Sequence, residues 1–245
     1  QSKRDVVFVV DATSSMRDTW AETVASIQTT MLSSVPGDTR YALVTYQDHP
    51  DGGGVVGNYP SRVDQDFTEN PEDILNALGK VELAPAGDPA ESVYSGIMQG
   101  LSLHWRKDAS KVMLVLGDGP AKDPEPITGL TWQTLLIGSY AVSNARVSTV
   151  GNPAAMGAGL TELTEATGGR TIPDGTSGKT PQDIADDVTE GSADKPFAWL
   201  QGPYVAKVGS EVRLDARASY SPNGDVVKYE WDFDGDGTFD ETTTA

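Results

Sequence analysis

The chain has 245 residues, a length at which one large domain and two unequal domains are both expected, because single hydrophobic cores stop growing at about 250 residues. It carries 36 Asp and Glu against 18 Lys and Arg, and the resulting net charge of −18 argues against nucleic acid or an anionic membrane surface as a partner. The absence of cysteine excludes disulfides, thiolate catalysis and Cys-ligated zinc, and no apolar run approaches the ~20 residues that membrane insertion requires.

In the first part of the chain, short apolar runs typical of buried strands alternate with segments whose apolar residues have helical spacing. Residues 5–11 are almost wholly apolar and β-branched, which is typical of a strand buried on both faces. Residues 16–31 carry apolar side chains three and four positions apart, as one face of an amphipathic helix does, and a Pro-Gly pair follows. Residues 41–46 predict a second strand, and the glycine-rich segment 47–59 predicts a loop or hairpin tip.

The middle of the chain continues this alternation. Asn70 followed by Pro71 predicts the start of a short helix, because Asn is a preferred cap and Pro is favoured at the first helical position. A further helix is expected to begin at Pro89, and residues 111–117 repeat the pattern of a buried strand. The other expected elements are helices at 130–144, 160–167 and 181–189 and strands at 146–150 and 171–172.

Strands that alternate with helices at this pace imply parallel pairing. We therefore expect an α/β fold with a doubly wound, mostly parallel sheet flanked by helices. Ligands of such sheets bind at the carboxyl ends of the strands. The two most apolar strands end in Asp11 and Asp118, which places the expected site at those two ends.

The pattern changes near residues 191–197. Beyond this point no helical stripe is found, and residues 212–216 and 227–231 alternate apolar with polar side chains, as half-buried antiparallel strands do. We therefore expect two domains, 1–194 and 195–245, of which the second is a small, incomplete all-β module.

The turn after the first strand contains Asp11, Thr13 and Ser15. One carboxylate and two hydroxyls in a fixed turn suit a hard divalent cation such as Mg²⁺ or Ca²⁺. The turn by itself equally suits a helix cap made by Thr13 or Ser14.

Three motifs in this order resemble the von Willebrand factor A domain and its metal-ion-dependent adhesion site. Residues 6–16 are similar to the first strand and D-x-[ST]-x-S-M turn of that family, residues 87–93 to the loop that often carries a metal-binding Thr, and residues 114–120 to the strand with the last metal Asp. The resemblance runs from 6 to about 188. It implies that a bound Mg²⁺, Mn²⁺ or Ca²⁺ is held directly or through water by Asp11, Thr13, Ser15 and Asp118.

The loop at 87–93 departs from the family pattern at the position of the Thr. A subset of such domains has G-G-D-x-P-E there, so the ligand would be Asp88 or, in its place, Glu91. Asp88 also suits the cap of the helix expected at Pro89. In the family the metal keeps one coordination position open for an acidic side chain of a partner protein, and the resemblance therefore implies a non-catalytic, metal-dependent protein-binding or adhesion module.

An enzyme is the alternative interpretation of the same motifs. Mg-dependent haloacid-dehalogenase-like phosphohydrolases also place an Asp after the first strand and a later G-D-x-x-x-D, which residues 117–123 fit. These enzymes need a second carboxylate two residues after the nucleophile, and position 13 is Thr. The sequence Gly178-Lys179-Thr180 lacks the glycine that a phosphate loop requires six residues before its Lys. We therefore expect no enzyme.

The tail carries acidic residues at alternate positions. A D-x-D-x-D-G pattern lets several oxygens surround one Ca²⁺, although the bidentate Glu of an EF-hand loop is replaced by Thr243. The same acids could instead be solvated without an ion. A further alternative for the whole chain is a passive structural spacer, whose Ca²⁺ loops only stiffen the β-sandwich. The candidate residues for a second Ca²⁺ are Asp232, Asp234, Asp236 and Asp240.

The tail also resembles the first part of the polycystic kidney disease (PKD) type β-sandwich module. Residues 208–216, 219–225 and 229–233 carry the similarity, and the closing strands of that family are absent after Ala245. Because that module is mostly found outside cells, the resemblance implies a secreted or cell-surface protein, with no signal peptide in this chain.

Overall fold

The computed structural model describes residues 3–33, 38–142, 145–151, 153–172, 198, 200, 204–217, 219, 221 and 224–245. The chain divides into two compact units, Gln1–Ser192 and Ala193–Ala245. The helix expected at 181–189 and the Gly178-Lys179-Thr180 segment lie outside the described residues. Among the residues that are described, no helix has the length and apolar character needed to cross a membrane.

The first unit is built on a six-stranded sheet in the order β3-β2-β1-β4-β5-β6. Its strands are β1 (Lys3–Asp11), β2 (Thr39–Tyr46), β3 (Arg62–Thr68), β4 (Ala109–Leu116), β5 (Ala145–Val150) and β6 (Thr171–Ile172). Every pairing is parallel except that of β3, which runs antiparallel to β2 at the edge. The expected α/β class with a mostly parallel sheet is confirmed, and the strand order reverses between β1 and β4, where ligands of such sheets bind.

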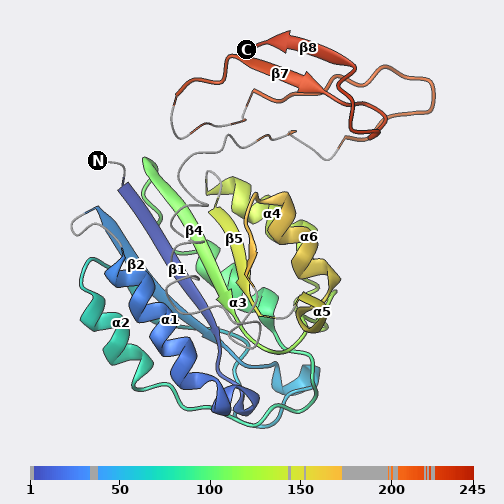
Figure 1. Ribbon diagram of the computed structural model, residues 1–245. Helices are drawn as coiled ribbons and strands as arrows, with labels where there is room; N and C mark the ends of the chain where they lie inside the picture. The colour runs from blue at the N-terminus through green and yellow to red at the C-terminus, as the bar shows by residue number, and fades with distance from the viewer. Residues whose placement is uncertain are drawn as a thin grey trace. The chain divides into compact units, whose positions relative to one another are not determined.

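Helices cover both faces of this sheet (Figure 1). They are α1 (Trp20–Leu32), α2 (Pro71–Leu78), α3 (Val93–Leu101), α4 (Trp132–Ala141), α5 (Pro153–Met156) and α6 (Ala158–Ala166), with short 3₁₀ turns at Ser14–Asp18 and Pro50–Gly52. Alternate residues of β1 face opposite cores, as the two-residue period of a strand requires. Phe8 packs with α1 and α2, whereas Val9 packs with α3, α4 and α6.

Two helix starts differ from the sequence prediction. The helix expected at Pro89 begins at Val93, because the backbone of Glu91 pairs with another segment of the chain. Its N–H donates to the Pro120 carbonyl at 2.8 Å, and its carbonyl accepts from the backbone N–H of Lys122 at 3.2 Å. The helix expected from Met16 begins as a 3₁₀ turn and becomes α-helical at Trp20. The cap at Asn70 is confirmed, since its side chain accepts from the N–H of Glu72 at 3.3 Å.

The second unit contains a two-stranded antiparallel sheet of β7 (Lys228–Trp231) and β8 (Glu241–Thr244). The first of these confirms the strand expected at 227–231. The strand expected at 212–216 is wrong for the described residues: Val212 is solvent-exposed, and the N–H of Asp215 donates to the Tyr204 hydroxyl at 2.8 Å instead of to a neighbouring strand.

Candidate metal centre

The carboxyl ends of β1 and β4 bring the predicted site residues together. The two strands pair in parallel up to Val10 and Leu116, so that Asp11 and the residues after Leu116 emerge side by side. Asp11 ends β1, and Asp118 follows β4 by two residues. This is the position at which the strand order reverses, so the sheet topology itself brings the two carboxylates to one edge.

A chain of close oxygen–oxygen contacts joins the four predicted residues. Oδ1 of Asp11 accepts from the N–H of Thr13 at 2.8 Å and from its hydroxyl at 2.7 Å. The hydroxyls of Thr13 and Ser15 lie 2.9 Å apart, and the Ser15 hydroxyl donates to Oδ1 of Asp118 at 2.8 Å. Thr13 stands at the cap position of the 3₁₀ turn but its side chain makes no capping bond, so the capping interpretation of Thr13 is wrong.

Three buried oxygens at this edge lack a hydrogen-bond partner among the described residues. They are Oδ2 of Asp11, the hydroxyl of Tyr46 and Oε2 of Glu91. Gly117 leaves the space for one of them, because a Cβ at this position would clash with the Tyr46 hydroxyl. Buried polar atoms almost always have a partner, so such a group of oxygens indicates a water or cation position.

The electrostatics of the site also favour a cation. Burial raises the pKa of Asp11 to about 6, partly opposed by the hydrogen bonds from Thr13 and reinforced by the charge of Asp118. Burial raises the pKa of Glu91 to about 8, and the charges of Asp11 and Asp48 add to this shift. Two buried acids with raised pKa values, of which Asp11 disfavours the charged form of Glu91, fit a hard divalent cation, which prefers oxygen ligands.

The structure distinguishes Asp88 from Glu91. Glu91 is 3% exposed and interacts electrostatically with Asp11, whereas the Asp88 side chain is 41% exposed and its Oδ1 accepts from the N–H of Ala90 at 3.0 Å. Asp88 does not cap a helix, because α3 begins only at Val93. Of the two candidates, Glu91 therefore lies in the interior beside Asp11, and Asp88 lies at the surface.

Two residues near the site were missed from the sequence. Asp48 is fully buried, and its Oδ1 accepts from the N–H of His49 at 2.8 Å and from the Ser92 hydroxyl at 2.9 Å. Lys122 forms an ion pair with the other oxygen of Asp48. Asp48 follows the end of β2 by two residues just as Asp118 follows β4, but the glycines after it are typical of a loop and give no sign of a site.

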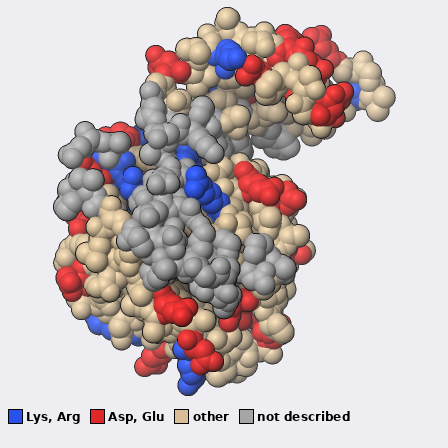
Figure 2. Space-filling model, in the orientation of Figure 1, with Lys and Arg blue, Asp and Glu red and all other residues tan. Residues whose placement is uncertain are grey.

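The tail loop brings three of its four candidate residues together. Carboxylate oxygens of Asp232, Asp234 and Asp240 lie within 4.8 Å of one another. Asp236 lies outside this group, and its Oδ1 accepts from the N–H of Thr238 at 2.7 Å. Figure 2 shows acidic side chains gathered over the second unit, in keeping with a loop that attracts cations.

Comparisons with known proteins agree with the fold of the first unit. The family model described as the von Willebrand factor type A domain matches residues 5–151. The crystal structure of a conserved hypothetical protein, BatB from Bacteroides thetaiotaomicron, superposes with a TM-score of 0.54 at 11% sequence identity, covering 77% of this chain and 98% of that chain. At this identity the likeness concerns the fold alone. No curated protein matched the chain.

Proposed function

The chain belongs to the von Willebrand factor type A domain family, whose model it matches over residues 5–151, and from this premise we propose that its first unit is a non-catalytic, divalent-metal-dependent protein-binding module. Domains of this family commonly mediate protein–protein interaction. The observation that carries the metal dependence is the group of buried, unpartnered oxygens of Asp11, Tyr46 and Glu91 beside the chain of close oxygen–oxygen contacts from Asp11 to Asp118.

The residues of the site divide into a buried and an exposed set. Asp11, Thr13 and Glu91 are buried and would hold Mg²⁺, Mn²⁺ or Ca²⁺ from within the fold. Ser15 and Asp118 are exposed and would hold it from the solvent side. The ion, when bound, supplies a Lewis-acidic position for a carboxylate of the partner. A partner can reach only the exposed side, so Ser15 and Asp118 mark the proposed binding face.

The phosphohydrolase alternative gains no support from the site. The position that would need a carboxylic acid is Thr13, whose hydroxyl bonds Asp11. The second acid of the G-D-x-x-x-D pattern, Asp123, accepts a hydrogen bond from the Tyr94 hydroxyl at 2.8 Å. Neither residue places a carboxylic acid beside Asp11 as the general acid that an aspartyl nucleophile would require.

The binding function is tested with peptides selected from a displayed random library on the full chain in Mg²⁺. We expect the selected peptides to share an Asp or Glu, and their affinity to fall at least tenfold in EDTA, after change of that acid to its amide, or on Asp118→Ala. The control Asp18→Ala removes an exposed acid of the neighbouring 3₁₀ turn and should leave affinity unchanged. Peptides that bind equally well in EDTA would contradict the metal-dependent function.

For the second unit we propose a Ca²⁺-stiffened β module of a secreted or cell-surface protein. The specific support is the convergence of Asp232, Asp234 and Asp240 in the loop between β7 and β8.

Calcium is expected to slow proteolysis of the β7–β8 hairpin several-fold in the full chain, and Asp234→Asn is expected to abolish the protection. Asp225→Asn, an exposed acid of the same unit, serves as control. Equal cleavage rates in Ca²⁺ and EDTA would contradict calcium binding by this loop and would show that its acids are ordinary solvated surface charges.

A further inference from the structure

The ammonium of Lys122 is enclosed by three oxygens from two segments, the loop after β2 and the segment of Asp88. Its Nζ forms an ion pair with Asp48, donates to the carbonyl of Gly52 at 2.7 Å and lies 3.4 Å from Oδ1 of Asp88. The Lys122 side chain is 8% exposed. Lysine is rarely buried without a partner, and three acceptors match the three donors of an ammonium.

The backbone conformation near Lys122 allows these oxygens to surround its ammonium. Gly53 has φ of 113°, and a Cβ there would clash with Oδ2 of Asp88 and lie 2.7 Å from Nζ of Lys122. Asp48 is held in place by the Ser92 hydroxyl and the N–H of His49. The loop after β2 can therefore approach Asp88 and Lys122 only because a glycine stands at 53.

The groups that surround this ammonium are those that a hard divalent cation prefers. Two carboxylates and one carbonyl face Nζ, and all three supply oxygen. Glu91 lies close enough to interact electrostatically with Lys122, Asp48 and Asp88 on this side and with Asp11 on the other, and its Oε2 is buried without a partner among the described residues. Glu91 thus interacts electrostatically both with the candidate metal centre and with the groups around the ammonium.

The charge balance explains why a cation is needed there. Five carboxylates gather at this end of the sheet, and Lys122 forms ion pairs with two of them. Removal of the ammonium would leave Asp48 buried without a counter-charge, which is strongly unfavourable in a low-dielectric site. The five carboxylates are Asp11, Asp48, Asp88, Glu91 and Asp118.

We propose that Lys122 takes the place of a second divalent cation beside the candidate metal centre, so that the first unit binds a single ion. The ammonium is a cation tethered to the chain, and it joins the loop of Asp48 and Gly52 to the segment of Asp88 without any dependence on metal supply. This inference rests on the proposed function for the first ion. Beyond that function, Lys122 sets the number of divalent ions that the first unit binds.

The test is a count of bound Mn²⁺ on the full chain by isothermal titration and by electron paramagnetic resonance of free Mn²⁺. All proteins carry Asp232→Asn and Asp240→Asn, which removes the tail loop from the count. We expect one ion in this background, two after Lys122→Met, and one after Lys80→Met, which changes an exposed lysine. Mn²⁺ should also raise the melting temperature of Lys122→Met more than that of the background protein.

The outcomes separate this inference from the proposed function. No Mn²⁺ in the background protein would overturn the proposed function, and a single ion gained by Lys122→Met would still support the role of Lys122. A folded Lys122→Met protein that binds no more ions than the background would overturn the inference. If Lys122→Met unfolds in EDTA, recovery of the native circular dichroism with Mn²⁺ supports the inference, and failure to recover overturns it.

Discussion

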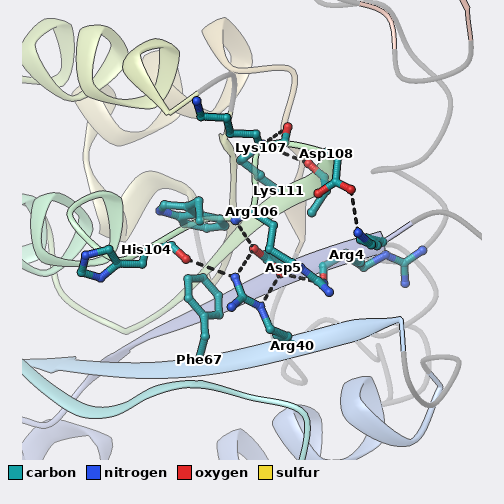
Figure 3. Close-up of polar contacts among 12 residues, drawn as sticks. Arg4, Asp5, Arg40, Phe67, His104, Arg106, Lys107, Asp108 and Lys111 are labelled. Atoms are coloured by element: carbon teal, nitrogen blue, oxygen red, sulfur yellow. Dashed lines mark hydrogen bonds and ion pairs between the residues drawn. The ribbon is translucent and has the colours of Figure 1, made fainter.

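Replacement of Asp5 by alanine is expected to lower the free energy of unfolding by about 3–5 kcal/mol, because it breaks a buried ion-pair network and leaves its partners uncompensated. Asp5 is fully buried in β1 and binds two arginines (Figure 3). Arg40 of β2 donates to it through Nε at 3.1 Å and Nη2 at 2.8 Å. Arg106, just before β4, donates through its backbone N–H and its Nε, each at 2.8 Å.

Asp108→Ala is the matched control, since it lies at the same end of the sheet. Its ion pair with Lys3 at 2.7 Å is exposed, and a much smaller loss than that of Asp5→Ala is expected. Urea unfolding followed by circular dichroism measures both variants. A second variant, Asp5→Ala with Arg40→Met, should recover part of the loss, because one of the two uncompensated guanidinium groups is removed. A loss below about 1 kcal/mol for Asp5→Ala would show that water replaces the carboxylate at little cost.

This network also bears on the candidate site at the other end of the sheet. Asp5 and Asp11 stand six residues apart on β1, which is about 20 Å along an extended strand. Asp5 joins β1 to residues of β2 and to the residue that leads into β4, and these three strands carry Asp11, Asp48 and Asp118 at their opposite ends. We infer that the network stabilises the central strand pairings that bring these carboxylates to one edge.

The sheet could be predicted from sequence because its signal is local. The runs in β1 and β4 are apolar on both faces, and only a strand covered by two helical layers buries both faces at once. Edge strand β3 was missed although Val63, Gln65 and Phe67 alternate with charged residues, because the glycine-rich segment before it is typical of a loop.

The site was only partly predictable for a different reason. The turn from Asp11 to Ser15 is contiguous, and its hydrogen bonds follow from residue spacing. The role of Glu91 depends on a backbone pairing with the segment at 120–122, some 30 residues away, which holds 91 in an extended bridge instead of a helix. Lys122 and Asp48 are 74 positions apart in the sequence, and no local pattern in either segment predicts their contact.

Asp11→Asn is expected to have opposite effects on stability in EDTA and in Mg²⁺. Burial raises the pKa of Asp11 from 3.8 to about 6. The ionised carboxylate therefore opposes folding by about 3 kcal/mol at pH 7.5, because a tenfold change in proton affinity corresponds to about 1.4 kcal/mol. Asparagine removes this charge and keeps an oxygen that accepts from Thr13, so the variant should be more stable than the unchanged protein in EDTA by about 1–3 kcal/mol.

The pH dependence of that gain follows from the sign of the pKa shift. The penalty of the charged carboxylate is fully present above pH 6 and disappears as the pH falls towards 4, because the folded protein takes up the proton first. The difference between Asp11→Asn and the unchanged protein should therefore shrink over this range. The control Asp18→Asn changes an exposed acid of the adjacent turn. It should show neither the gain in stability in EDTA nor the decrease of that gain at low pH.

In Mg²⁺ the order of stability should reverse. An ion present at one thousand times its dissociation constant stabilises the folded chain by about 4.1 kcal/mol, which exceeds the gain of about 1–3 kcal/mol that Asp11→Asn has in EDTA, and a variant without the Asp11 carboxylate should lose this increment. Urea unfolding of both proteins with and without Mg²⁺ measures the four free energies, and their double difference isolates the ion's dependence on Asp11. If Asp11→Asn is less stable in EDTA and gains as much from Mg²⁺ as the unchanged protein, then Asp11 is a structural acid and the cation binds elsewhere.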